Sequence, residues 1–358
     1  MYDNHYIVMN KQKICILFGT RPEIIKLFPL IRKLNNKNFF IIFSNQHFSK
    51  NMSSNFFKEL KIKKIKYTFS NKNKKVFMND FYRYTKNIFK KEKPDTIIIQ
   101  GDTNSSVVGC LAGKEYSKNI KKKIKIIHVE AGLRSYDFTM PEEINRTIID
   151  HNSDLLFVPT VLQKENLINE GVSKKKIFIV GNTIADSIKY FKINKINSKY
   201  KDYILVTFHR HELLENLKRL KKVINLINKI AYQTKDTIVF PIHPRTRKIL
   251  DNNKFVLNKN IKLIKPQSYV NFLSLIKSSK LVLSDSGGLQ EECCILKKHH
   301  ITLRNNTERP ETINLNSNII SNLSFKIINN RINFLMKNKI TWVHPYKNKV
   351  SEKILKKF

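Results

Sequence analysis

The chain has 358 residues, of which 41% are hydrophobic and 27% are charged, as in ordinary soluble globular proteins. This length suits two domains, each large enough to bury its own core. The formal net charge is +39, but the lysines are spread along the whole sequence. We therefore interpret them as solvated surface residues, a distribution that disfavours a specific nucleic-acid partner. No apolar run reaches the roughly 18 residues that span a bilayer, which excludes a membrane protein.

The sequence further indicates a cytoplasmic protein. The apolar run nearest the N-terminus, Ile14–Phe18, is too short for a secretory signal. Cys15, Cys110, Cys293 and Cys294 form neither a CxxC pair nor a disulfide framework, which suits a reducing compartment. Because adjacent cysteines in a helix cannot easily point at one ion, we predict no metal site.

Short apolar runs alternate with helix-length segments along the chain. The expected strands are 13–18, 39–43, 96–100, 124–129, 155–158 and 177–180, then 203–207, 237–241, 261–264, 281–284 and 301–303. The helix-length segments include 23–34, 104–116, 142–152, 217–232 and 269–277. Apolar strands bounded by helices predict parallel sheets covered on both faces. Eleven strands exceed one comfortable sheet, and the strand-poor stretch 184–201 divides them. We therefore predict an α/β fold with two Rossmann-like, doubly wound domains facing a cleft.

Polar motifs occupy the ends of the expected strands, where open α/β sheets bind ligands. The first, residues 19–26, follows the first strand. Gly19 permits a tight turn, and Arg21 and Lys26 are suited to phosphate beside a helix N-terminus, although a capped helix with surface cations explains them equally well. Asp102 follows another strand and is either a helix cap or a site residue.

Further carboxylates and arginines follow in the segments 128–134 and 141–146. Glu130 and Glu142 lie, like Asp102, at strand-to-helix junctions, and this recurrence favours a site over an acidic first helical turn. Arg134 and Arg146 accompany them. Carboxylates whose pKa values are separated can act as general acid and general base.

The second half repeats the arrangement. His209 follows a strand and is placed to meet a phosphate or leaving-group oxygen, although a structural role is also open. Gly287 and Gly288 expose backbone N–H groups at a helix start, which favours an anion. Glu292 lies one turn further on, where it could meet a ribose diol, and Arg309 is expected on the same rim.

Together these motifs resemble one family. The segments GTRPEIIK, QGDT, HVEAGLRS, PEEINR, VGNTIADS, FHRHE, SDSGGLQEE and TERPE, in this order, are similar to the non-hydrolysing UDP-N-acetylglucosamine 2-epimerases. The likeness runs from about Lys13 to Pro345-Tyr346. It implies a GT-B-like architecture, a homodimer and no cofactor. It also implies an N-terminal domain of residues 1–183 with a returning C-terminal helix, 346–358, and a UDP-binding domain of residues 184–345.

The resemblance also implies roles for individual residues. The catalytic set is Lys26, Asp102, Glu130, Glu142 and His209, and the substrate-binding set is Arg21, Arg134, Arg146, Ser286, Gly287, Gly288, Glu292 and Arg309. Three segments depart from the family pattern. His211 stands where many bacterial members carry an arginine, in a region that they use for allosteric activation, so the resemblance leaves that regulation open. The changes at 294–299 and 347–349 are expected to alter loops only.

The implied reaction inverts C2 of a UDP-linked N-acetylhexosamine. UDP is eliminated to leave a 2-acetamidoglucal and is then added back, and the product supplies surface polysaccharide synthesis. UDP-GlcNAc is the expected substrate. The alternatives are a related UDP-hexosamine, of the UDP-2,3-diacetamido uronic acid or UDP-FucNAc type, a hydrolysing epimerase, and a GT-B glycosyltransferase. A polyanion-binding protein is the non-enzymatic alternative.

Overall fold

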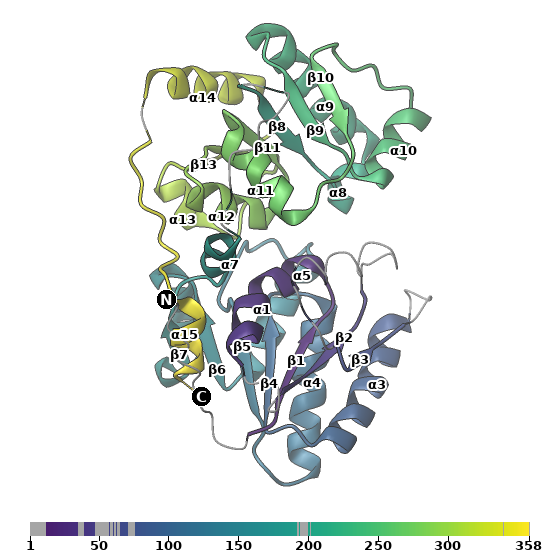
Figure 1. The fold of residues 1–358 in the computed structure, drawn as a ribbon, viewed down its shortest axis with the longest axis vertical. Helices are drawn as coiled ribbons and strands as arrows, with labels where there is room; N and C mark the ends of the chain where they lie inside the picture. The colour runs from purple at the N-terminus through teal and green to yellow at the C-terminus, as the bar shows by residue number, and fades with distance from the viewer. Residues whose placement is uncertain are drawn as a thin grey trace. The chain divides into compact units, whose positions relative to one another are not determined.

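The computed structural model describes the chain except residues 1–11, 35–38, 47–56, 58–59, 61, 63–64, 71–75, 192, 194–199, 201, 339 and 358. The chain forms two compact units, residues 1–187 with 345–358 and residues 188–344 (Figure 1). Each unit contains one parallel sheet whose strands alternate with helices. The predicted α/β class, with two doubly wound parallel sheets, is confirmed.

The first unit has a seven-stranded sheet in the described residues. Its strands are β1 (Ile14–Phe18), β2 (Phe39–Phe43), β3 (Tyr67–Thr68), β4 (Thr96–Gln100), β5 (Lys125–Val129), β6 (Leu155–Val158) and β7 (Ile177–Ile179). They lie in the order β3-β2-β1-β4-β5-β6-β7. The order reverses between β1 and β4, and the crevice beyond the carboxyl ends of such a pair is where doubly wound folds bind ligands.

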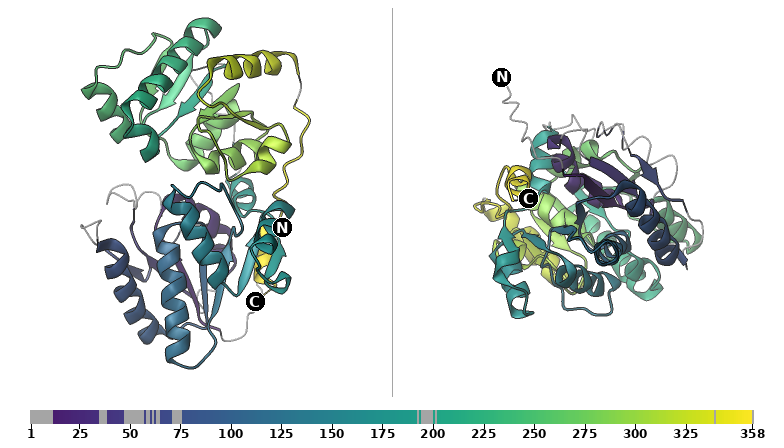
Figure 2. Two further views of the ribbon diagram at one scale, coloured as in Figure 1. Left: turned by 180° about the vertical axis from the view of Figure 1, so that it is seen from behind. Right: turned by 90° about the horizontal axis from the view of Figure 1, so that it is seen from below.

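Helices cover both faces of this sheet. They are α1 (Arg21–Lys33), α3 (Phe77–Glu92), α4 (Asn104–Asn119), α5 (Pro141–Asn152), α6 (Val161–Asn169) and α15 (Val350–Leu355), with a 3₁₀ turn at Lys174–Lys176. α3, α4 and α5 lie side by side on one face, and α1 packs with α15 on the other (Figure 2). Because both faces are covered, β1 and β4 are buried at every position.

The C-terminal segment completes the first unit. Asp186 accepts hydrogen bonds from the backbone N–H groups of Val350 and Ser351, at 3.2 and 2.8 Å, and so caps α15. Gly181 has a φ of +100°, and a Cβ there would lie 2.1 Å from the carbonyl oxygen of Tyr346. This close approach admits only glycine.

The second unit has a six-stranded sheet in the described residues. Its strands are β8 (Ile204–Thr207), β9 (Ile238–Pro241), β10 (Ile261–Ile264), β11 (Leu281–Ser284), β12 (His300–Thr302) and β13 (Asn318–Ile320). Its helices are α8 (His211–Leu214), α9 (Leu217–Thr234), α10 (Pro244–Asn252), α11 (Tyr269–Ser278), α12 (Gly287–Ile295), α13 (Pro310–Asn314) and α14 (Phe325–Lys337). The order β10-β9-β8-β11-β12-β13 reverses between β8 and β11. Both units therefore have the same kind of switch point.

The structure differs from the sequence-based expectation at two edge strands, in the stretch 184–201, and by one residue at several strand ends. β3 and β13 lie at sheet edges, and strands of two and three residues are too short to give an apolar pattern. β12 begins at His300. The stretch 184–201 contains a helix, α7 (Ile184–Tyr190), although part of this stretch lies outside the described residues.

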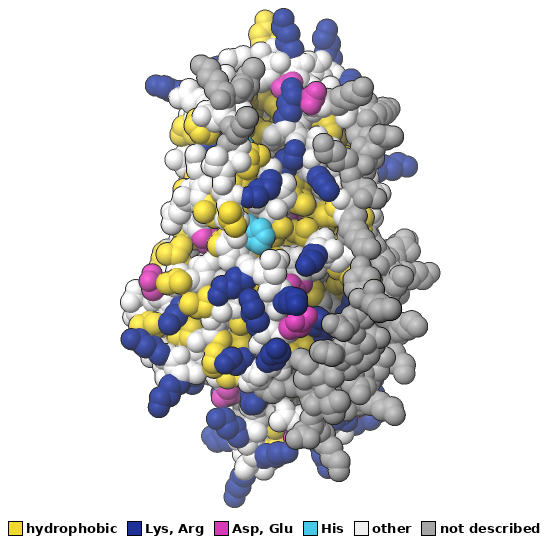
Figure 3. All heavy atoms as spheres, turned by 60° about the vertical axis from the view of Figure 1, so that its left-hand side comes forward, with side chains coloured by type: hydrophobic (Ala, Val, Ile, Leu, Met, Phe, Trp, Pro, Cys, Tyr) yellow, Lys and Arg dark blue, Asp and Glu magenta, His cyan; other side chains and the backbone are white. Residues whose placement is uncertain are grey.

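The positive charge is dispersed. Lysine and arginine side chains alternate with hydrophobic and uncharged ones over the face shown in Figure 3, and they form no single basic stripe there. This distribution agrees with the interpretation of the lysines as solvated surface residues. No helix in the described part of the chain is long and apolar enough to cross a membrane.

We expect buried His300 to make the second unit sensitive to acid. Its ring is fully buried, Nδ1 lies 2.9 Å from Oδ1 of Asn318, and burial lowers its pKa to about 4. An unfolded histidine titrates near pH 6.5, so the unfolded chain binds more protons between these values. We expect its contribution to stability to be complete above pH 6.5 and to fall by about 3 kcal/mol as the pH drops to 4.

Urea unfolding of wild type and His300→Gln at pH 7 and pH 4.5 measures this loss. The variant should be less stable at pH 7 but should lose less stability on acidification. His151→Gln, at an exposed position of α5, serves as the control and should leave the pH dependence unchanged. Equal pH dependence in wild type and His300→Gln would contradict the assignment to His300.

Candidate active site

Buried Glu23 joins two loops at the switch point of the first unit. One carboxylate oxygen accepts hydrogen bonds from the backbone N–H groups of Gly19 and Thr20, at 3.0 and 2.7 Å. The other accepts from the hydroxyl groups of Thr103 and Ser106, at 2.9 and 3.0 Å. Burial raises the pKa of Glu23 to about 7, although these hydrogen bonds oppose the shift. Glu23 thus fixes the loops that follow β1 and β4 against each other.

Lys26 and Glu130 form a buried ion pair beside these loops. Glu130 follows β5 and has a φ of +70°, a left-handed conformation that is costly for a residue with a side chain. Its carboxylate also accepts hydrogen bonds from the side-chain amides of Gln100 and Asn182, the latter at 3.0 Å. Two predicted catalytic residues are therefore in contact, and three donors fix the orientation of Glu130.

Arg146 links Asp102 to α5. Its Nη2 donates to Oδ2 of Asp102 and its Nη1 donates to Oε2 of Glu143, both at 2.5 Å. Glu143 is fully buried and also accepts from the backbone N–H groups of Ser135 and Tyr136. The family resemblance implies that Arg146 contacts substrate. In the structure its guanidinium group pairs with two protein carboxylates.

Arg21 and Glu142 are, with Asp102, the partly exposed predicted residues of this unit. Arg21 is the first residue of α1, and Glu142 follows Pro141 in the first turn of α5. Both side chains are partly exposed. In the part of the chain that the structure describes, Glu142 has no hydrogen-bond or ion-pair partner. Its carboxylate is thus available to a ligand, in contrast to its neighbour Glu143.

Arg134 lies inside the protein. Its Nη1 donates to Oδ2 of Asp150 at 2.8 Å, and its Nε and Nη2 donate to both oxygens of Glu170 at 2.6 Å. His128 contacts the other oxygen of Asp150 at 2.7 Å and the carbonyl oxygen of Gly101 at 2.9 Å. The side chain of Arg134 is 2% exposed, which favours a role in holding the loops over contact with substrate.

The switch point of the second unit has a similar buried carboxylate. Asp285 follows β11, and its Oδ2 accepts hydrogen bonds from the backbone N–H groups of His209 and Arg210, at 3.0 and 2.9 Å, beyond the end of β8. The side chain of His209 is about half exposed, and its Nδ1 lies 3.9 Å from Oδ1 of Asp285. The predicted residue His209 is therefore anchored at this switch point.

The N-terminus of α12 lies beside it. Ser286 is the N-cap, and Gly287 and Gly288 form the first turn. A Cβ at Gly287 would lie 2.2 Å from Oε1 of Glu308 and 2.9 Å from Nη1 of Arg309. A Cβ at Gly288 would meet no atom of the described residues within 4 Å, apart from its chain neighbours and the backbone of its own helix. The first glycine is required by packing, and the second borders open space. Free backbone N–H groups at such a helix start favour an anion.

The remaining predicted residues line the same helix. Arg309 lies 3.0 Å from Oε1 of Glu291 and 2.7 Å from Oε1 of Glu308. Glu292 accepts a hydrogen bond from the hydroxyl group of Tyr269 at 2.9 Å. Both predicted side chains are nearly buried, and the structure gathers Ser286, Gly287, Gly288, Glu292 and Arg309 around α12.

Sequence reasoning missed the residues that orient this set. Gln100, Asn182 and Asp285 contact predicted residues directly, and Glu23 and Asp150 hold the loops. Their position in the sequence could have identified them, since Gln100, Asn182 and Asp285 all lie at or just beyond strand ends. In the described residues, no group of three His, Cys, Asp or Glu side chains is arranged to hold a metal ion. The side chain of His211 lies outside the described ones.

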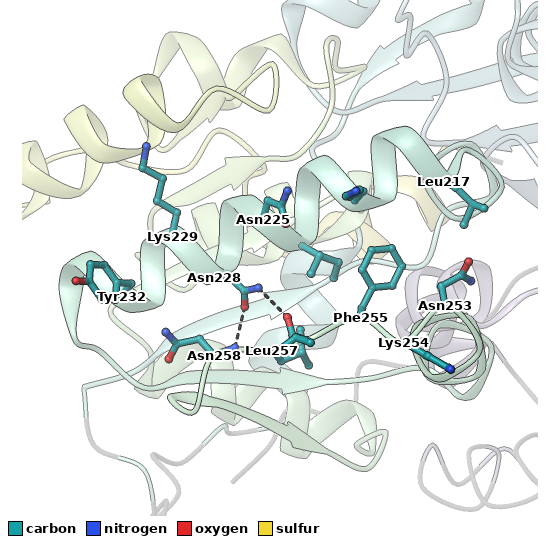
Figure 4. Close-up of a pocket in the computed structure, with 13 residues that line it drawn as sticks. Leu217, Asn225, Asn228, Lys229, Tyr232, Asn253, Lys254, Phe255, Leu257 and Asn258 are labelled. Carbon is teal, nitrogen blue, oxygen red and sulfur yellow. Dashed lines mark hydrogen bonds between the residues drawn. The ribbon is translucent and has the colours of Figure 1, made fainter.

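A groove of about 820 Å³ lies on the second unit, between α9 and residues 253–258 (Figure 4). Asn228 of α9 donates to the carbonyl oxygen of Val256 and accepts from the backbone N–H of Asn258, so the groove wall is tied to the helix. None of the predicted site residues lines it. We therefore assign the candidate site to the switch points and not to this groove.

Comparisons with known proteins agree with the motifs. Residues 31–357 match the family model described as UDP-N-acetylglucosamine 2-epimerase. A UDP-N-acetylglucosamine 2-epimerase of Methanococcus maripaludis is 43% identical, over 96% of this chain and 97% of that one. A UDP-2,3-diacetamido-2,3-dideoxy-D-glucuronate 2-epimerase of Pseudomonas aeruginosa is 34% identical, over 86% and 88%. The crystal structure of Methanocaldococcus jannaschii UDP-GlcNAc 2-epimerase in complex with UDP-GlcNAc and UDP is 42% identical, with a TM-score of 0.87, over 96% and 98%.

Proposed function

The chain belongs to the UDP-N-acetylglucosamine 2-epimerase family, and from this premise we propose that it reversibly converts UDP-GlcNAc into UDP-ManNAc. The observation that supports this activity most directly is the arrangement at the first switch point. There Asp102 and Glu130 follow β4 and β5, and Glu142 is unpaired within the described residues. An isolated transferase base would not need three such carboxylates.

The reaction explains why several carboxylates are required. The C2 hydrogen is not next to a carbonyl group, so we propose that its removal is coupled to departure of UDP from C1. One carboxylate takes the C2 proton, the C1–O bond breaks with its electron pair on the diphosphate, and a 2-acetamidoglucal forms. Protonation of C2 from the opposite face and re-addition of UDP complete the inversion. A base and an acid on opposite faces are thus needed.

The two units supply different parts of this chemistry. We assign proton transfer to Asp102, Glu130 and Glu142 of the first unit, with Lys26 and Arg21 beside them. We assign UDP to the second unit, where Gly287 and Gly288 offer N–H groups to the diphosphate. Glu292 binds the ribose and Arg309 supports this turn. Arg134 and Arg146 position loops through the carboxylates that they contact.

No redox cofactor is required by this route, because no hydride is transferred. We further propose that the protein acts in the cytoplasm as a homodimer, supplying sugar nucleotides for surface polysaccharides. A related UDP-hexosamine is the alternative substrate, since the relative named for UDP-2,3-diacetamido-2,3-dideoxy-D-glucuronate shares 34% identity.

Incubation in deuterated water with each UDP-hexosamine as sole substrate tests this proposal. We expect UDP-ManNAc to form from UDP-GlcNAc, with deuterium at C2, as observed by NMR spectroscopy. Conversion of only a diacetamido uronic acid would change the substrate, and release of free ManNAc would indicate a hydrolysing enzyme. Absence of C2 exchange in every UDP-sugar would refute the epimerase proposal and favour a transferase.

A further inference from the structure

Asp285 has two carboxylate oxygens in different situations. Oδ2 accepts the backbone N–H groups of His209 and Arg210 and so fixes the loop after β8. Oδ1 is buried and has no hydrogen-bond partner in the described part of the chain. A buried carboxylate oxygen without a donor is unfavourable. The fold therefore retains an acceptor at the second switch point that the protein backbone does not use.

The group that faces this acceptor is His209. Its Nδ1 lies 3.9 Å from Oδ1 of Asp285, within ion-pair distance but longer than a hydrogen bond. The imidazole is 52% exposed, whereas the Asp285 side chain is 2% exposed, so the ring is the partner with room to rotate. Catalytic hydrogen bonds commonly shorten when a ligand binds.

A second histidine nearby is arranged differently. His243 is the N-cap of α10, and its Nδ1 accepts the backbone N–H of Arg245 at 3.2 Å. Burial, then the charges of His209 and Arg245, lower the pKa of His243. Because its Nδ1 is an acceptor, His243 is a neutral capping residue. Of the two rings, only His209 lies opposite a carboxylate with a free oxygen.

We infer that Asp285 is a positioning residue that acts through His209. Its Oδ1 accepts Nδ1–H of the imidazolium and so directs Nε2–H toward the departing diphosphate of the substrate. As the C1–O bond breaks, its electron pair stays on the diphosphate oxygen, which takes the Nε2 proton. His209 is left neutral with Nδ1–H still held by Asp285, and re-addition of UDP returns the proton to Nε2. This inference rests on the proposed function.

A double-mutant cycle tests whether Asp285 acts through His209. In Asp285→Asn the amide oxygen can still accept both backbone N–H groups, but the NH₂ group then faces Nδ1 and opposes the required tautomer. We expect kcat to fall ~10–10²-fold with KM changed less than threefold, as for loss of a partner that orients an acid–base group. His209→Asn should cost ~10²-fold or more.

The informative protein is the double variant. If Asp285 acts through His209, Asp285→Asn should not lower kcat further in the His209→Asn background. An equal factor in both backgrounds would overturn the inference, because it would show a purely structural role. Asp236→Asn is the matched control, since Asp236 pairs with Lys280 on the surface of the same unit and its removal should leave kcat unchanged.

A spectroscopic measurement on the wild-type protein keeps the test independent of mutant folding. The ¹⁵N–¹H correlations of the His209 ring, with UDP bound, should show a proton on Nδ1. A ring protonated on Nε2 alone would overturn the inference. Wild-type turnover of UDP-sugars is measured first, because it tests the proposed function separately. If C2 exchange is absent while Nδ1 carries a proton, the proposed function fails but the contact between Asp285 and His209 stands.

Discussion

Replacement of Glu142 by glutamine should reduce the rate of C2 exchange ~10²–10⁴-fold while leaving the fold intact. The expected size follows from the loss of one positioned acid or base. The stability expectation follows from the structure, because Glu142 is partly exposed and has no partner among the described residues. Deuterium incorporation at C2 and urea unfolding, measured on the same preparation, separate the two effects.

Two neighbouring substitutions provide the comparison. Glu143→Gln should reduce stability, since Glu143 is fully buried and pairs with Arg146. Glu165→Gln, at an exposed position of α6, should change neither exchange nor stability. If Glu142→Gln retained full turnover, Glu142 would not be a catalytic carboxylate, and the site would have to be reassigned.

Glu142 and Glu143 also show which features of the site can be predicted from the sequence. Strand ends were predictable because parallel strands buried on both faces are uniformly apolar, and β2, β4, β6, β10 and β11 begin and end as predicted. The positions of the motifs at the switch points followed from those ends. Which of two adjacent glutamates turns inward depends on tertiary contacts with residues 135–136, and no local pattern encodes it.

The partners of the two arginines Arg134 and Arg146 could not be predicted from the sequence either. Arg134 and Arg146 lie in the same segments as the predicted carboxylates Glu130 and Glu142, and the family resemblance implies that both arginines bind substrate. In the structure their guanidinium groups are neutralised by Asp150, Glu170 and Glu143. These partners lie 3 to 36 positions away in the sequence, at separations that no motif connects. Burial and pairing, which only the fold reveals, favour a positioning role for both arginines, and their contact with substrate stays a prediction.

Each switch point is stabilised by one buried carboxylate that accepts backbone N–H groups. Glu23 does so in the first unit and Asp285 in the second. Glu23 follows β1, and its carboxylate contacts both the start of its own helix and the segment after β4. Asp285 follows β11, and its carboxylate contacts the segment after β8. Loops that must present polar groups to a ligand cannot bury apolar side chains there, so hydrogen bonds to a buried carboxylate supply the rigidity.

Replacement of Gly288 by alanine should weaken UDP binding at least ~10-fold, about 1.4 kcal/mol, without destabilising the protein. Beyond its own helix backbone and chain neighbours, a Cβ at this position meets no atom of the described residues within 4 Å, so the folded chain has room for it. Alanine also favours a helix over glycine, which should leave stability equal or slightly higher. The methyl group would instead occupy the space in front of the N–H groups that we assign to the diphosphate.

Gly287→Ala supplies the contrasting case. Its Cβ would lie 2.2 Å from Oε1 of Glu308, which is buried and paired with Arg309, so both side chains would have to shift. We expect a loss of about 1–3 kcal/mol in stability together with weaker binding. Isothermal titration with UDP and urea unfolding distinguish the two variants. Unchanged affinity for UDP in Gly288→Ala would mean that the diphosphate does not lie at the N-terminus of α12, because a methyl group placed there would obstruct it.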